Sequence, residues 1–79
     1  MQTYRDFRNQ LADERLTKTE RDEKTKAYLL QALEDNAWSM GTTALRLGLF
    51  ASYLNAVLRR FGCWDIYTDK RSEALWKAK

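Results

Sequence analysis

The chain is 79 residues long, contains one Cys, no His and no Pro, and carries a formal net charge of +3 at pH 7. This length allows a single domain, residues 1–79, with a small core. The composition excludes an internal disulfide and a zinc site built from His and Cys. The N-terminus is charged from Arg5 onward, and no apolar run approaches the ~18 residues of a membrane span. The sequence therefore predicts no signal peptide and no membrane partner, and a cytoplasmic protein.

Helix-forming residues dominate the chain, and glycine occurs only at Gly41, Gly48 and Gly62. With no proline to interrupt them, helices are expected almost throughout. The predicted fold is all-α, a small helical bundle of about four helices plus a short C-terminal extension.

The first predicted helix covers residues 3–16. Tyr4, Phe7 and Leu11 follow one another at i, i+3 and i+7 and form a single apolar stripe. Thr3 is suited to cap its N-terminus.

The second predicted helix starts near Thr19 and ends at Asp35 and Asn36. Asn36 is expected to adopt the left-handed conformation common after a helix. A broad apolar face fills the C-terminal half of this segment, with Ala27, Leu29, Leu30, Ala32 and Leu33.

The third predicted helix is capped by Ser39 and ends near Leu47. Gly48 then stands where the chain must turn sharply, a position that favours positive φ. Met40, Ala44 and Leu47 share one apolar face at i, i+4 and i+7.

The fourth predicted helix covers residues 51–60, with Leu54 and Leu58 facing inward together with Phe61. Gly62 is suited to the position that follows a helix C-terminus. The tail, residues 63–79, is ambiguous, and a short final helix capped by Asp69 or Ser72 is expected there. Within the tail, Trp64 and Trp76 are expected to pack in the core. Cys63 is expected to be a small, semi-buried apolar residue.

The basic charge is concentrated in the second half of the chain. Residues 1–37 hold seven Lys/Arg and eight Asp/Glu, a net charge of −1, whereas residues 38–79 hold seven Lys/Arg and three Asp/Glu, a net charge of +4. Two short helices joined at a glycine, residues 37–62, lie in this basic half. That arrangement predicts a helix-turn-helix that presents its second helix to DNA.

A series of positions supports this prediction with a spacing that holds without a gap over residues 29–62. The matched positions are Leu29, Leu30, Ala32, Leu33, Ala44, Leu47, Gly48, Leu49, Leu54, Leu58, Arg59, Arg60, Phe61 and Gly62. They resemble the DNA-binding domain of the Fis family, which also closes many nitrogen-response enhancer-binding activators. The family usually carries glycines before this unit, where Ala37 and Trp38 stand here, and Thr43 replaces the first residue of its Ala-Ala pair.

The resemblance implies a homodimer, built by the two N-terminal helices in residues 1–36. Its predicted contact residues are Tyr4, Phe7, Leu11 and Leu30. The resemblance also implies double-stranded DNA as the partner, although the family Arg that reads guanine is Ala51 here. Readout of DNA shape is therefore expected to dominate.

The predicted DNA contacts fall into three groups. Arg46, Arg59 and Arg60 would meet phosphates, or remain ordinary surface charge. Asn55 would contact adenine, or be solvated. Phe50 and Tyr53 would contact thymine methyl groups or sugars, or pack elsewhere. A basic C-terminal arm would follow the backbone or minor groove, with Lys70, Arg71, Lys77 and Lys79. The complete predicted set of DNA-binding residues is Thr42, Arg46, Phe50, Ser52, Tyr53, Asn55, Arg59, Arg60, Lys70 and Arg71.

No catalytic group is recognisable, because no nucleophile has a His partner and no glycine-rich phosphate loop exists. The sequence predicts a non-enzymatic protein without cofactor or metal, acting as a dimeric transcriptional regulator or nucleoid-associated protein in a bacterial or phage-infected cell. The alternative is a Fis-like scaffold that binds a protein, as an inhibitor, antirepressor or adaptor of a phage or mobile element. Its contact surface would be the apolar patch of Phe50, Ala51, Tyr53, Ala56 and Val57.

Overall fold

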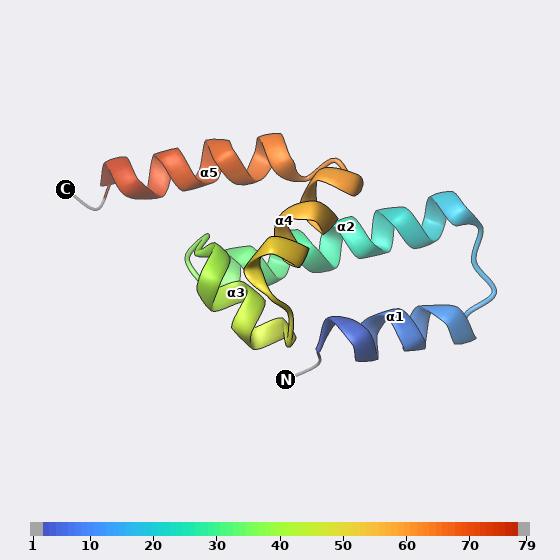
Figure 1. The fold of residues 1–79 in the computed structure, drawn as a ribbon. Helices are drawn as coiled ribbons and strands as arrows, with labels where there is room; N and C mark the ends of the chain where they lie inside the picture. The colour runs from blue at the N-terminus through green and yellow to red at the C-terminus, as the bar shows by residue number, and fades with distance from the viewer. Residues whose placement is uncertain (1–2, 78–79) are drawn as a thin grey trace.

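The computed structural model describes residues 3–77 and folds them into five helices, with no strand in that range. In chain order they are α1 (Tyr4–Asp13), α2 (Lys18–Asp35), α3 (Met40–Leu47), α4 (Ala51–Arg60) and α5 (Trp64–Lys77) (Figure 1). The predicted all-α bundle is confirmed. Among the residues described, no helix combines the length and the apolar character that crossing a membrane requires.

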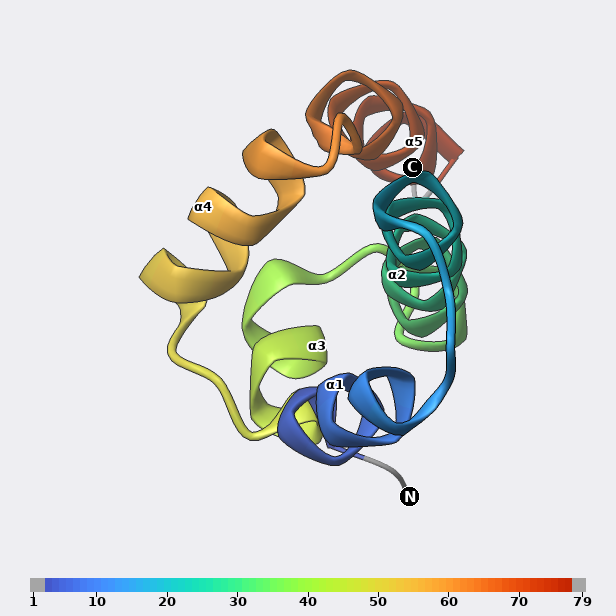
Figure 2. The same ribbon diagram turned by 90° about the vertical axis from the view of Figure 1, so that its right-hand side faces the viewer.

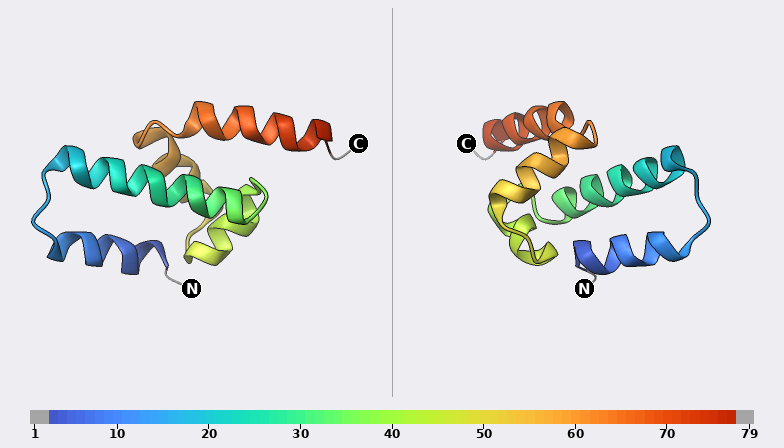
Figure 3. Two further views of the ribbon diagram at one scale, coloured as in Figure 1. Left: turned by 180° about the vertical axis from the view of Figure 1, so that it is seen from behind. Right: turned by 45° about the vertical axis from the view of Figure 1, so that its right-hand side comes forward.

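The helices surround a common core in a body of 45 × 22 × 19 Å. α1 and α2 run antiparallel, and α2 lies between α1 and α5 (Figure 3). α4 lies across the molecule from α2, and no other helix covers its outer side (Figure 2). This arrangement leaves one face of α4 open to solvent.

The core joins α2 to α3 and α4. Leu29 and Leu33 of α2 belong to the same core cluster as Leu54 and Leu58 of α4, and all four side chains are fully buried. Burial of each such side chain stabilises the fold by about 1.5–3 kcal/mol. The inward positions predicted on the third and fourth helices are confirmed, since Ala44 and Leu47 are also buried and Met40 and Phe61 pack partly buried against the core.

Val57 is the exception on α4. The sequence predicted it within an exposed apolar patch, but its side chain is 5% exposed and belongs to the core. The reason is helical geometry, because a residue three positions after Leu54 lies on the same face.

The predicted N-terminal caps are confirmed at two helices. The Thr3 hydroxyl accepts a hydrogen bond from the Asp6 N–H at 3.2 Å, and the Ser39 hydroxyl accepts one from the Thr42 N–H at 3.3 Å. α2 begins at Lys18, which agrees with the predicted start near Thr19. Thr17 caps this helix, because Thr17 and Glu20 form a reciprocal capping box.

Helices α2, α3 and α4 all end in the same backbone motif. The N–H groups of Trp38, Leu49 and Cys63 donate to the carbonyl five residues earlier, at 2.7, 2.8 and 2.8 Å. This Schellman motif requires a positive φ at the residue before each donor. The predicted Gly48 and Gly62 supply it at 73° and 72°.

At the end of α2 the prediction for Asn36 is wrong. Asn36 has φ −113°, and the positive values fall on Ala37, at 55°, and on Trp38, at 61°. The Asn36 side chain instead donates its amide to the Ala32 carbonyl at 2.7 Å. Ala37 and Trp38 thus adopt the left-handed conformation, which is unfavourable for residues other than glycine.

The tail is more regular than predicted. α5 begins at Trp64 and continues to Lys77, so it is not a short helix capped by Asp69 or Ser72. Cys63 and Tyr67, four residues apart, are both buried in the core, and Trp64 packs against it. This docking of the first turn fixes the helix from its start.

Candidate nucleic-acid interface

The outer surface of α4 is exposed along the whole helix. Its inward face is occupied by Leu54, Val57 and Leu58, which are 0–5% exposed. The residues exposed on the other side are Ala51, Ser52, Tyr53, Ala56, Arg59 and Arg60. The exposed face of α4 therefore carries basic side chains at its C-terminal end and small or aromatic side chains at its N-terminal end.

The segment that contains α3 and α4 has no negative side chain. No Asp or Glu occurs in residues 36–64, and the segment holds three Arg, at positions 46, 59 and 60. All three arginines are exposed. A surface of this kind attracts polyanions, since nothing within the segment offsets its positive charge.

Arg59 is held in place by its neighbours. Its Nε donates to the Asn55 Oδ1 at 2.9 Å, and its guanidinium carbon lies 4.3 Å from the centre of the Trp64 ring. The same hydrogen bond uses one lone pair of the oxygen that Asn55 would offer to an adenine amino group. Because an amide oxygen has two lone pairs, Asn55 keeps one acceptor position and its amide donors for adenine while Arg59 holds it in place.

The N-terminal end of α4 carries aromatic side chains. Phe50 precedes the helix, is 84% exposed and makes no side-chain cap. Tyr53 is 52% exposed and meets Tyr4 of α1 edge-on, with ring centres 6.4 Å apart. Of the predicted apolar patch, Phe50, Tyr53, Ala51 and Ala56 are exposed and Val57 is not.

The predicted contacts on α3 lie on its exposed side. Thr42 and Arg46 are exposed, one helical turn apart. The Thr42 hydroxyl accepts a hydrogen bond from the Ser39 hydroxyl at 3.1 Å. Arg46 thus adds an exposed arginine on α3 to the two on α4.

Whether the predicted basic C-terminal arm contacts DNA stays a prediction, but its described residues do not form an extended chain. Lys70 and Arg71 belong to the continuous helix α5, and a helix cannot follow a minor groove as an extended chain does. Arg71 Nη1 donates to the Trp38 carbonyl at 3.3 Å, and Lys70 pairs with Glu73 at 4.0 Å. Arg71 thereby fastens α5 to the strained turn after α2. Lys79 lies outside the described residues, as do the side chains of Trp76 and Lys77.

The residues predicted for dimerisation lie inside the fold of one chain. Tyr4 and Leu11 are 7% and 3% exposed. The Phe7 ring stacks on Tyr28 of α2 at 4.1 Å between centres, and Leu30 packs against the core while partly exposed. The apolar stripe of α1 therefore covers α2 of its own chain, and the homodimer stays a prediction.

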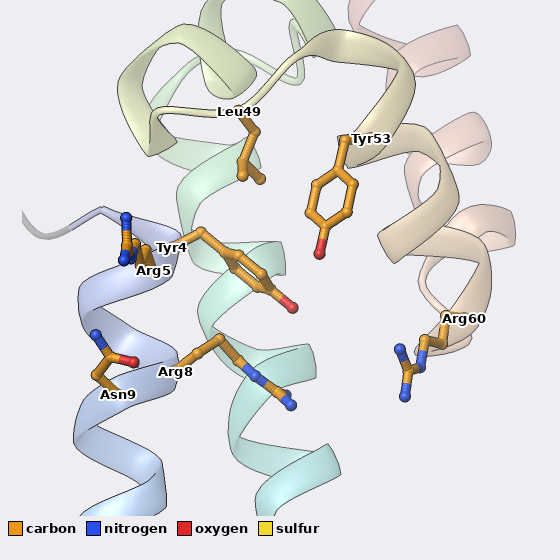
Figure 4. Close-up of a pocket in the computed structure, with 7 residues that line it drawn as sticks. All are labelled: Tyr4, Arg5, Arg8, Asn9, Leu49, Tyr53 and Arg60. Atoms are coloured by element: carbon orange, nitrogen blue, oxygen red, sulfur yellow. The ribbon is translucent and has the colours of Figure 1, made fainter.

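A groove separates α1 from α4 and encloses about 380 Å³. Figure 4 shows that its residues come from both helices and from the turn before α4, and that the Tyr4 and Tyr53 hydroxyls point into it. It is lined by Tyr4, Arg5, Arg8, Asn9, Leu49, Tyr53 and Arg60. Burial raises the pKa of the Tyr4 hydroxyl above its ordinary value, while the positive charges of Arg8 and Arg60 act in the opposite direction.

Sequence reasoning missed Arg5 and Arg8 as surface residues of interest, because it assigned the first helix to dimerisation. A signal was present: Arg5 and Arg8 are three residues apart and flank the apolar stripe at Tyr4. Their proximity to Tyr53 and Arg60 depends on the tertiary fold.

Cys63 is fully buried, as is common for a free Cys in a core. Burial raises the pKa of its thiol, with a smaller opposing effect from Lys26. The expectation that it acts as a small apolar residue is in keeping with this position.

Comparisons with protein families, with curated proteins and with solved structures find no match for this chain.

Proposed function

We propose that the chain is a small DNA-binding protein, a regulator or nucleoid-type protein, that uses α3, the turn and α4 as a helix-turn-helix. α4 would enter the major groove with its open face, while α3 would lie across the backbone. The observation that carries the proposal is the acid-free segment of residues 36–64, whose three arginines are all exposed.

The same surface indicates how DNA would be read. α4 offers few side chains that can pair with base edges, because Ala51 and Ala56 occupy exposed positions. Phosphate contacts position a protein but carry no base code. Recognition would therefore depend mainly on DNA shape and deformability, with weak sequence preference.

A homodimer remains part of the proposal. Two copies of α4 would bind successive major grooves if the subunits held them about 34 Å apart. A second copy would also add buried surface to a domain of 79 residues, which is small for independent stability.

The proposal is tested by replacing an arginine, Arg46, that makes no side-chain hydrogen bond or ion pair within residues 3–77. Arg46→Gln should weaken binding to duplexes of any sequence about equally and reduce the salt slope by about 1. Arg15→Gln is the matched control, because Arg15 is exposed in the loop between α1 and α2, away from α3 and α4. Fluorescence anisotropy with a labelled duplex at several salt concentrations measures both. Equal behaviour of the two variants would contradict the proposed surface.

Protein binding is the second candidate, and a specific observation favours it. Phe50 is 84% exposed and Leu45 is 79% exposed, although both are large apolar residues. Exposed apolar surface of this kind marks protein interaction sites, and Phe is among the residues enriched there. If this function holds, Phe50→Ser should abolish binding of a protein partner, and DNA binding should be absent or insensitive to Arg46→Gln.

A further inference from the structure

The groove between α1 and α4 carries an unusual excess of positive charge. Three of its lining residues are arginines, Arg5, Arg8 and Arg60, and none of the residues that line it is Asp or Glu. Two of the arginines come from α1 and one from the last turn of α4 (Figure 4). The groove thus brings together cations from distant parts of the sequence.

No carboxylate pairs with these arginines within residues 3–77. The ion pairs found in that range join Lys24 to Glu14 and Lys70 to Glu73. Arg8 instead donates to the Thr25 hydroxyl at 3.2 Å and lies 5.6 Å from the Phe61 ring centre. Arg60 lies 5.7 Å from the same ring centre. Both guanidinium groups are therefore positioned without being neutralised.

Arg5 differs from the other two because it is exposed and makes no hydrogen bond or ion pair in the described structure. Its side chain is free to close on a ligand. A guanidinium presents several N–H donors in a planar fork that matches phosphate oxygens. Three such groups around one groove form a site for a group with more than one negative charge or with several acceptor oxygens.

The remaining lining residues suit the same ligand. The hydroxyls of Tyr4 and Tyr53 point into the groove (Figure 4). A tyrosine hydroxyl is protonated at neutral pH, and burial raises the pKa of Tyr4 further, so this hydroxyl can donate a hydrogen bond. Asn9 adds an amide. The groove therefore offers neutral donors beside the three cations.

We infer that this groove is a phosphate-binding site and that the phosphate it takes belongs to the DNA backbone beside α4. The second part rests on the proposed function. Tyr53 and Arg60 are seven residues apart on α4 and lie on the flank that faces α1. A helix seated in the major groove has the phosphates of a strand along each flank. α1 would thus supply Arg5 and Arg8 as a clamp on one strand.

Arg5→Gln tests the clamp in the full chain, with Arg15→Gln as the control of equal charge. If the groove holds a backbone phosphate, Arg5→Gln should lower the salt slope by about 1 and weaken binding roughly tenfold at low salt. Arg15→Gln should leave both values near those of the wild type. Thermal melting by circular dichroism confirms that each variant is folded, and Arg5 makes no contact whose loss would unfold the chain.

The outcomes separate the clamp from the proposed function. Wild-type binding with equal effects of the two variants would overturn the clamp and leave DNA binding by α4 intact. Absence of wild-type binding at low salt would overturn the proposed function and the backbone as the source of the phosphate.

A titration with inorganic pyrophosphate tests the groove's phosphate chemistry without DNA. In NMR spectra of the labelled protein, saturable shifts are expected for the side-chain N–H signals of Arg5, Arg8 and Arg60, with little change at Arg15. Shifts of equal size at Arg15 would contradict a phosphate site in the groove.

Discussion

Thr43 and Thr25 offer a matched test of how polar groups are treated in this small core. Both are fully buried and both lie within helices. The Thr25 hydroxyl donates to the Arg21 carbonyl at 2.8 Å and accepts from Arg8. The Thr43 hydroxyl has no hydrogen-bond partner within the described structure. The two residues therefore differ in the satisfaction of one hydroxyl group.

Replacing each residue by Val removes the hydroxyl while keeping nearly the same shape. A buried polar group without a partner costs about 1–3 kcal/mol, so Thr43→Val should raise the free energy of unfolding by about 1–2 kcal/mol. Thr25→Val loses two hydrogen bonds and leaves Arg8 without its acceptor, which should cost about 1–3 kcal/mol. For a domain of this size, ~1 kcal/mol corresponds to a change in Tm of about 4–8 °C.

Urea denaturation followed by circular dichroism measures both changes, at one protein concentration so that self-association does not contribute. The midpoint should rise for Thr43→Val and fall for Thr25→Val, with the slope unchanged. A loss of stability for Thr43→Val comparable to that for Thr25→Val would refute the reasoning, because it would mean that the Thr43 hydroxyl is hydrogen-bonded in solution.

Two further predictions concern the strained turn and the buried tyrosines. Ala37→Gly should stabilise the fold by about 0.5–1 kcal/mol in the same urea experiment, because the left-handed conformation costs a residue with a side chain about 1–2 kcal/mol and costs glycine little. Ala27→Gly, at an exposed helical position, is the control and should destabilise the fold by a similar amount. The opposite order of stabilities would contradict strain at Ala37. Burial raises the pKa of Tyr4 and Tyr28, so above pH ~10 the folded state binds more protons than the unfolded state, and the free energy of unfolding should fall as pH rises. Tyr4→Phe should make this fall shallower. An unchanged pH dependence in that variant would count against burial of the Tyr4 hydroxyl.

Local chemistry explains which parts of the fold could be predicted from the sequence. Thr3 and Ser39 can be predicted as caps because a hydroxyl directly before a helix accepts a hydrogen bond from a free backbone N–H of the first turn. Gly48 and Gly62 were recognised because positive φ favours glycine. The same rule failed at Ala37, where the Schellman motif forms without a glycine and is supported by Arg71 from α5.

Features that depend on tertiary contacts could not be predicted in this way. α5 starts at Trp64 because Cys63 and Tyr67 are buried against other helices, and the weak alternation of its residues does not reveal that burial. Val57 was placed on the exposed patch because the extent of the inward face of α4 depends on what packs against it.

Among the candidate functional residues, those that line the groove depend most clearly on the tertiary fold. The cations of the groove come from α1 and α4, which are distant in sequence, and only the fold places Arg5 and Arg8 opposite Arg60. The predicted arginines of the helix pair, by contrast, could be found from sequence because they belong to one short acid-free segment.

The most direct test of DNA binding is the affinity of the wild-type protein for a random-sequence duplex between 50 and 200 mM salt, measured beside its mass in solution. Three phosphate contacts from Arg46, Arg59 and Arg60 predict a slope of about −2.7 per subunit, and so a loss of roughly 40-fold over this range, and the clamp by α1 would make the slope steeper by about 1. A dimer that engages both subunits would show about twice that slope. Undetectable binding at 50 mM salt, or an affinity that does not change with salt, would contradict the account.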